Sequence, residues 1–143
     1  DIDHFKVFND SHGHTFGDDA LKLVSKIILM TVRESDTVSR YGGEEFIVVL
    51  PNTEPAYAFL LAEKLRSAVD QCTITDGSGT SEGVTISLGV SSYPFMANTT
   101  KALIESADNA LYQSKLNGRN MVSSAKRDMI RTEDTSLKKR VQT

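Results

Sequence analysis

Two consecutive glycines, Gly42 and Gly43, constrain the fold of this chain more than any other feature of its sequence. They separate two short runs of strand-forming residues, 37–41 and 44–50. A Gly-Gly pair readily adopts the positive φ angles that a two-residue hairpin turn requires. The sequence therefore predicts a β-hairpin, and with it a sheet that contains neighbouring antiparallel strands.

Three other segments carry apolar residues at the spacing of an amphipathic helix. They cover residues 19–34, a segment that follows Thr53, and residues 100–117. Thr53 is the expected cap of the second helix, and Gly118 stands where a glycine often ends a helix. The predicted buried positions are Leu21, Val24, Ile27 and Ile28 in the first, Ala58, Leu61, Ala62, Leu65, Ala68 and Val69 in the second, and Leu103, Ile104, Ala107 and Leu111 in the third.

Residues 84–91 alternate between apolar and polar side chains, which predicts a strand with one buried face, and residues 120–123 predict a short edge strand. The order is strand, helix, hairpin, helix, strand, helix, short strand. This order indicates an α+β fold, with an antiparallel central sheet flanked by helices and a ferredoxin-like βαββαβ core. A doubly wound parallel sheet fits less well, because the glycine pair forces antiparallel neighbours near the centre.

Length and composition agree with one soluble domain. The chain has 143 residues, of which 39% are hydrophobic, and it holds no apolar run long enough to span a bilayer. The single cysteine, Cys72, favours a reducing compartment, so we expect the domain to be cytoplasmic. Because the first residue is Asp1 and a strand-like segment starts at once, we expect the sequence to be cut from a longer protein.

The charge of the chain is unevenly distributed. Residues 1–123 carry 16 acidic and 10 basic side chains, whereas residues 124–143 carry 3 acidic and 6 basic ones. An acidic body argues against a general nucleic-acid binder, which needs basic side chains to neutralise phosphates. If the domain handles phosphates, metal ions are expected to take part.

Four acidic residues stand where they can meet. Asp1 and Asp3 lie at the end of the first predicted strand and project to the same face, while Glu44 and Glu45 follow the glycine turn. Carboxylates repel one another unless a hard cation lies between them, and Mg²⁺ binds oxygen ligands while leaving positions free for phosphates. Any one of these acids alone is more simply a solvated turn residue. The set of four predicts a metal site.

The motifs around these acids resemble those of the GGDEF family of diguanylate cyclases, in the form that has two glutamates. The resemblance covers residues 1 to about 123. It rests on Asp1-Ile2-Asp3-His4-Phe5-Lys6, Asn9, His14-Thr15-Phe16-Gly17-Asp18, Arg40-Tyr41-Gly42-Gly43-Glu44-Glu45-Phe46, Ala110-Leu111-Tyr112, Lys115 and Gly118-Arg119-Asn120. The resemblance implies a sheet like the palm of nucleotide cyclases and polymerases, and condensation of two GTP into cyclic di-GMP with release of two pyrophosphates across a homodimer.

The resemblance also implies the ligands of the metal and the phosphates. Asp1 and Glu44 would bind Mg²⁺ through their carboxylates and Ile2 through its carbonyl, with a second ion near the same acids and Mn²⁺ as an alternative. Glu44 is the first choice for the base that accepts the hydroxyl proton, and Glu45 is the alternative. Lys6 would stabilise charge that develops on the phosphates, although a lysine after a strand is usually a solvated charge.

Five further residues are implied in GTP binding. Asn9 and Asp18 resemble the pair that reads guanine, and His14 would line the nucleotide pocket. The simpler roles are a turn residue for Asn9, an N-cap for Asp18 and an exposed loop histidine for His14. Lys115 and Arg119, expected on one helical face, resemble the pair that grips the β- and γ-phosphates. They would also complement the dipole of a helix C-terminus without a ligand.

Arg33 and Asp36 stand at the spacing from Gly42 at which the family has its inhibitory site for cyclic di-GMP. A guanidinium and a carboxylate suit the phosphates and guanine edges of this product, and Arg66 is expected to contribute from the next helix. The alternative is an ion pair between residues three apart at a helix end.

The family has a helix and most of a first strand ahead of the Asp-Ile-Asp motif, and this chain does not contain them. We expect residues 1–123 to form the domain without these parts, residues 124–143 to form a flexible basic tail, and a longer protein to supply a sensor domain and, in some cases, a membrane attachment. Two other functions stay open. One is a catalytically silent receptor or scaffold that binds cyclic di-GMP, and the other is a Mg²⁺-dependent nucleotidyl transferase of different specificity.

Overall fold

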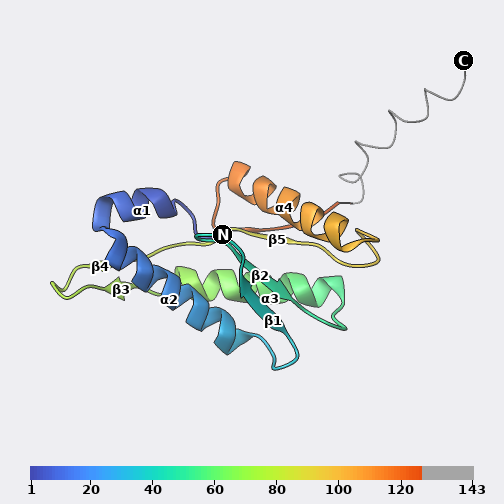
Figure 1. Cartoon of the computed structure of the whole chain (residues 1–143), viewed down its shortest axis with the longest axis horizontal. Coiled ribbons are helices and arrows are strands. Elements are labelled where there is room, and N and C mark those ends of the chain that lie inside the picture. Colours follow the sequence, from blue (N-terminus) through green and yellow to red (C-terminus); the bar gives the residue numbers. More distant parts are fainter. Residues whose placement is uncertain (127–143) are drawn as a thin grey trace, which may run out of the picture.

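The computed structural model describes residues 1–126, and Figure 1 shows how the elements are arranged. In chain order the elements are α1 (Phe5–His12), α2 (His14–Thr31), β1 (Thr37–Arg40), β2 (Phe46–Val49), α3 (Pro55–Asp70), β3 (Ile74–Thr75), β4 (Ser81–Glu82), β5 (Leu88–Val90), α4 (Thr100–Leu116) and β6 (Val122–Ser124). Most of the predicted basic tail, residues 127–143, lies outside the described residues. Ser124 belongs to β6 and Ala125 is buried, so the folded part extends slightly past residue 123.

The strands pair mainly in antiparallel fashion, and the predicted α+β class is confirmed. β1 and β2 form the expected hairpin, in which Thr37 pairs with Val49 and Arg40 with Phe46. Ile2 forms an antiparallel bridge with Ile86, which lies just ahead of β5. β5 and β6 depart from the expectation because they pair in parallel. The reason is topological: α4 crosses over between them and returns the chain in the same direction.

The long α2 helix begins at His14, five residues earlier than the predicted start at residue 19. Gly13 separates α2 from α1 with a φ of 86°, so one residue is enough to turn the chain between the helices. The predicted apolar face is otherwise confirmed, since Leu21, Val24 and Ile28 are buried and Ile27 packs against the same core while half-buried. They form part of a core that also holds Leu65 and Val69 of α3 together with Ile2 and Ile86.

The α4 helix buries a face of small residues, not the predicted row of larger ones. Ser106, Ala110 and Ser114 are buried, whereas Ile104 is 39% exposed. Close approach to β5 explains the difference. A Cβ at Gly89 would lie 2.1 Å from the Ala107 carbonyl oxygen, so the strand fits against the helix only where side chains are small.

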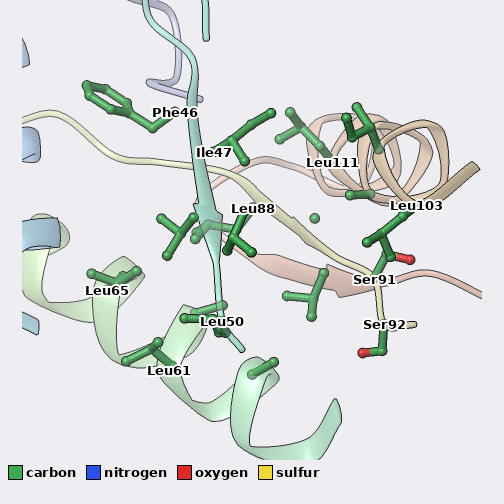
Figure 2. Close-up of a pocket in the computed structure, with 18 of the residues that line it drawn as sticks. Phe46, Ile47, Leu50, Leu61, Leu65, Leu88, Ser91, Ser92, Leu103 and Leu111 are labelled. Carbon is green, nitrogen blue, oxygen red and sulfur yellow. The ribbon is translucent and has the colours of Figure 1, made fainter. Parts of the chain in front are cut away.

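An apolar cleft of about 1050 Å³ separates the hairpin from β5 (Figure 2). Its walls come from β2, α3, β5 and α4, and they include Ile47, Leu61, Leu65, Leu88 and Leu111. Among residues 1–126, β2 pairs only with β1 and β5 only with β6, so the strand edges that face the cleft are free. Of the residues predicted to be buried on α4, Leu103, Ala107 and Leu111 line this cleft and are only half-buried.

Within the same described range, no helix is both long and apolar enough to cross a membrane.

Candidate active site

The first residues of the chain lie directly beside the loop that carries Glu44. The Ile2 amide donates to the Glu44 carbonyl oxygen at 3.2 Å. The antiparallel bridge to residues 85–87 fixes the same segment, with Asp3 N donating to Thr85 O at 2.9 Å and Ser87 N to Asp1 O at 3.0 Å. Two motifs that are about 40 residues apart in the sequence therefore meet at one edge of the sheet.

The expected convergence of four acids is wrong for Asp3. Asp3 is only 6% exposed. Its carboxylate accepts hydrogen bonds from Thr85 Oγ1 at 2.7 Å, from Ser87 Oγ at 2.6 Å and from the backbone N–H of Asn120 at 3.0 Å. A carboxylate with three donors needs no cation. Accordingly, nowhere in residues 1–126 do three or more His, Cys, Asp or Glu side chains group around a shared metal position.

Asp1 is the acid that α4 approaches. Its carboxylate lies 3.1 Å from Lys115 Nζ, and the Asp1 side chain is 7% exposed while that of Lys115 is 31% exposed. The contact therefore pairs a buried carboxylate of the first segment with a cation carried by α4.

The glycine loop is wider than the predicted two-residue turn. The β1–β2 pairing ends at Arg40 and Phe46, which leaves residues 41–45 as a five-residue loop in which neither glycine has a positive φ. Hydrogen bonds explain its shape. The Tyr41 amide donates to the Glu45 carbonyl at 2.8 Å, and Arg40 Nη2 donates to the Gly43 carbonyl at 2.6 Å.

The two glycines of this loop serve different purposes. A Cβ at Gly42 would lie 2.8 Å from Glu45 Oε2, so Gly42 leaves room for the folded-back glutamate. A Cβ at Gly43 would meet nothing within 4 Å, so the loop is open to an incoming ligand at that point. Glu44 and Glu45 are both half-buried and lie in the loop ahead of β2.

The donor atoms at this edge fit a hard divalent cation. Asp1 and Glu44 supply carboxylates, and the Ile2 carbonyl oxygen accepts no hydrogen bond from the described residues. All of these donors are oxygens, which Mg²⁺ and Mn²⁺ prefer.

Asn9 lies within α1 and packs directly on α2, so the simpler role of a turn residue is excluded. Its side-chain oxygen would be 1.7 Å from a Cβ at Gly17, which shows that the amide occupies the space left by the missing side chain. Asn9 Oδ1 is buried and has no hydrogen-bond partner among residues 1–126. A buried polar atom without a partner is costly, and a bound ligand is one way to satisfy it.

Lys6, His14 and Asp18 lie on the same two helices. Asp18 follows Gly17 inside α2 and is exposed, so it is not the N-cap of this helix, a position that Gly13 holds. His14 is exposed at the first position of α2. Lys6 is exposed in the first turn of α1. The structure therefore places Asp18 directly after the glycine against which Asn9 packs.

Arg119 does not share a helical face with Lys115, contrary to the expectation. α4 ends at Leu116, and Gly118, Arg119 and Asn120 follow with φ angles of 117°, 65° and 46°. The change to positive φ turns the chain away from the helix axis, so spacing by four residues no longer places two side chains on one face.

Arg33 and Asp36 form a tight turn between α2 and β1. The Arg33 amide donates to Asp36 Oδ2 at 2.8 Å, and the Asp36 amide donates back to the Arg33 carbonyl at 3.0 Å. The Asp36 side chain has no exposed area, and within the described part of the chain its Oδ1 has no hydrogen-bond partner. Arg33 also donates to Thr53, whose hydroxyl binds the Pro51 carbonyl and does not cap α3. A hollow of about 270 Å³ opens beside this turn.

Arg66 does not line this hollow, although the sequence suggested it. Its guanidinium contacts Glu63, Asp70 and Asn120 on another side of α3. Lys64 lines the hollow instead, together with Tyr57, Leu60 and Leu61 of the same helix. These four residues follow helical spacing, whereas Arg66 lies two positions beyond Lys64 and thus about 200° around the helix. The spacing was visible in the sequence, but nothing indicated which face of α3 approaches Arg33.

Comparison with known proteins gives consistent results. Residues 1–121 match the family described as "Diguanylate cyclase, GGDEF domain". Diguanylate cyclase A of Treponema denticola is 49% identical over 129 residues, which cover 90% of this chain and 34% of that protein. The chain thus spans about a third of the length of this relative.

Two solved structures are also similar to this chain. The GGDEF domain of DgcB from Caulobacter crescentus in complex with c-di-GMP has a TM-score of 0.81 at 34% identity, with 87% of this chain and 73% of that chain covered. The active GGEEF domain of a diguanylate cyclase from Vibrio cholerae has a TM-score of 0.80 at 35% identity, with 88% and 79% covered. Sequence, fold and site geometry agree, and the chain belongs to the GGDEF domain family of diguanylate cyclases.

Proposed function

We propose that this domain condenses two GTP into cyclic di-GMP and releases two pyrophosphates. The observation that carries the proposal is the hydrogen bond between the Ile2 amide and the Glu44 carbonyl, because it joins the Asp-Ile-Asp segment to the glycine loop. Lys115 reaches the same edge through Asp1. Acidic metal ligands, a candidate base and a phosphate-binding cation therefore lie together.

Asp1, the Ile2 carbonyl and Glu44 are proposed to hold Mg²⁺, with Mn²⁺ as an alternative and two ions per active site. Family members are generally dependent on divalent metal ions. The bound ions would neutralise phosphate charge and stabilise the attacking 3′-oxygen as it loses its proton. The contact with Lys115 keeps the buried Asp1 carboxylate paired with a positive charge. When a metal ion takes over this pairing, Lys115 would be free to contact a phosphate.

The proposed GTP site extends from α1 to the end of α4. Asn9 and Asp18 read the guanine, and the unpartnered Asn9 Oδ1 beside Gly17 supports a ligand there. His14 lines the same end of the site. Lys6, Lys115 and Arg119 contact the phosphates, where their charges offset the negative charge of the leaving group.

Each subunit is proposed to hold one GTP, and two subunits face each other in a homodimer. The 3′-oxygen of one GTP attacks the α-phosphorus of the other, and the bond from that phosphorus to the pyrophosphate oxygen breaks. Glu44 accepts the hydroxyl proton, with Glu45 as the alternative. The two nucleotides then exchange roles: the 3′-oxygen of the second attacks the α-phosphorus of the first, and its pyrophosphate leaves. Two pyrophosphates are therefore released for each cyclic di-GMP.

Arg33 and Asp36 are proposed to bind cyclic di-GMP as an inhibitor. Support comes from the hollow beside their turn and from Asp36 Oδ1, which is buried and finds no hydrogen-bond partner in the described residues. Lys64 replaces Arg66 as the contribution from α3. A guanidinium, a carboxylate and an ammonium group match the phosphates and guanine edges of the product.

The apolar cleft is proposed to receive an extended segment joined to Asp1 in a longer protein, which also carries a sensor domain and holds the present domain in the cytoplasm. Ile2 already pairs with Ile86, so a chain that continues backward from Asp1 would run between β5 and β2 and meet their free edges. A protein extended by such a segment should have a higher thermal midpoint, because it buries the apolar walls. An unchanged midpoint would refute this role of the cleft.

The activity is tested by incubating the protein with GTP and Mg²⁺ and separating the nucleotides by chromatography. Formation of cyclic di-GMP and pyrophosphate in a 1:2 ratio supports the proposal. Binding of cyclic di-GMP without turnover would replace it with the receptor function. Turnover of another nucleotide in preference to GTP would point to a nucleotidyl transferase of different specificity.

A further inference from the structure

Arg66 and Asn120 belong to a hydrogen-bonded network that ends on a buried carboxylate beside the candidate active site. Arg66 Nη1 donates to the side-chain oxygen Oδ1 of Asn120 at 3.0 Å, and the backbone N–H of Asn120 donates to Asp3 Oδ2 at 3.0 Å. Thr85 and Ser87 supply the other donors to Asp3. The network joins α3, the segment after α4 and the first residues of the chain.

The segment held by this network has an uncommon backbone conformation. Gly118, Arg119 and Asn120 have three consecutive positive φ angles. Asparagine tolerates this region better than most residues because its short polar side chain can hydrogen-bond locally, whereas arginine has no such compensation for the crowding of its Cβ. Residues in such conformations persist only where surrounding contacts fix them, and they are common at functional sites.

The contacts that fix this turn can be named one by one. The Arg119 amide donates to the Ser114 carbonyl at 2.9 Å, and the Leu88 amide donates to the Met121 carbonyl at 3.0 Å. Between these two anchors, Asn120 is held through its amide by Asp3 and through its side chain by Arg66. Asn120 is therefore the central contact of the turn that carries Arg119.

Arg66 is itself held in place for this contact. Its side chain is 21% exposed, and Glu63 Oε2 at 3.1 Å and Asp70 Oδ2 at 3.5 Å flank its guanidinium. Lys101, which pairs with a carboxylate of its own helix, is by contrast 83% exposed. The two carboxylates on α3 direct the guanidinium toward Asn120.

We propose that Arg66 is a positioning residue for the GTP phosphates, because through Asn120 it holds the turn that presents Arg119. This inference rests on the proposed function, in which Arg119 contacts the β- and γ-phosphates. It also gives Arg66 a role different from the inhibitory site that the sequence suggested. Removal of the Arg66 guanidinium should weaken binding of the phosphates while the guanine contacts of Asn9 and Asp18 stay intact.

The test compares Arg66→Met with the wild-type protein by calorimetric titration with GTP and, separately, with GMP, both in the presence of Mg²⁺. GMP lacks the β- and γ-phosphates, so its affinity reports on the rest of the site. We expect Arg66→Met to bind GTP about tenfold more weakly, because the displaced Arg119 loses one charge-assisted hydrogen bond to the phosphates. The variant should bind GMP as the wild type does. Lys101→Met is the matched control, since it removes a cation paired within its own helix, and it should bind both as the wild type does.

A second variant separates positioning from folding. Asn120→Gly removes the side-chain oxygen that accepts the hydrogen bond from Arg66 but keeps the backbone N–H that donates to Asp3. Glycine also adopts the positive φ of this position readily. In this background Arg66→Met should cause no further loss of GTP affinity.

Three results would overturn the inference: equal GTP affinity in Arg66→Met and wild type, equal losses for GTP and GMP, or an undiminished effect of Arg66→Met in the Asn120→Gly background. A wild-type protein that binds no GTP would instead overturn the proposed function, and the inference with it. The two failures are distinguished by the wild-type titration.

Discussion

Gly17→Ala is the substitution for which the structure gives the sharpest expectation. The new Cβ would lie 1.7 Å from Asn9 Oδ1 and 2.8 Å from Asn9 Cγ. Real Cβ contacts are essentially never shorter than 3.0 Å, so the Asn9 amide has to leave its place on α2. Since the amide is the end of a side chain, it can rotate away without moving the backbone of either helix.

Two opposing effects set the stability of this variant. Alanine in place of glycine inside a helix stabilises it by about 1 kcal/mol. Displacement of Asn9 removes packing between α1 and α2, but it also exposes an oxygen that is buried without a partner. We therefore expect the free energy of unfolding to change by less than about 1 kcal/mol.

Nucleotide recognition should change more than stability. An amide that has moved loses its hydrogen bonds to guanine, and a hydrogen bond of about 0.5 to 1.5 kcal/mol corresponds to roughly a 2- to 12-fold loss of affinity. The assay is the KM and kcat for GTP in Gly17→Ala, Asn9→Ala and the double variant. KM should rise in both single variants, and Gly17→Ala should add nothing to Asn9→Ala because its effect passes through the same side chain.

Gly77→Ala is the control, because its φ is not positive and a Cβ there would meet nothing within 4 Å. It should leave KM and stability unchanged. A wild-type KM in Gly17→Ala, or a full additional loss on top of Asn9→Ala, would refute the reasoning that Gly17 makes room for Asn9.

Four other substitutions have definite expected outcomes. Glu44→Gln should abolish cyclic di-GMP synthesis without shifting the thermal midpoint, because it removes a charged ligand and candidate base from a half-buried loop; near-normal turnover would transfer both roles to Glu45. Asp18→Asn should weaken GTP binding about tenfold or more in a direct titration, because an acceptor of guanine N–H groups is lost, and equal affinity would contradict that contact. Arg33→Ala should keep the initial rate of product formation, but its progress curve should not reach the plateau that cyclic di-GMP causes in the wild type. If both proteins reach the same plateau, Arg33 and Asp36 form only a structural ion pair. Gly89→Ala should lower the free energy of unfolding by about 1 to 3 kcal/mol in a denaturant titration, since its Cβ would meet helix backbone at 2.1 Å and 2.3 Å, and an unchanged midpoint would contradict the close packing.

Local patterns were enough to predict most elements. The hairpin around residues 42–43 and the apolar face of α2 at Leu21, Val24 and Ile28 follow from periods of two and 3.6 residues, which depend only on neighbours in the sequence. Two details differ from the prediction for different reasons. The five-residue loop is shaped by local hydrogen bonds of Arg40 and Glu45, which have no periodic signal in the sequence. The small buried face of α4 depends on a partner elsewhere in the chain, because it is set by contact with Gly89.

The sequence by itself determined which chemical groups this protein has and the motifs that carry them. Only the tertiary structure decided how those groups are used. Asp3 is a buried hydrogen-bond acceptor because Asn120 reaches it across 117 positions, and Arg66 serves that same network instead of the hollow beside Arg33 because Asn120 lies 54 positions away. Contacts over such separations have no periodicity along the chain, so they arise only when helices and strands pack into three dimensions.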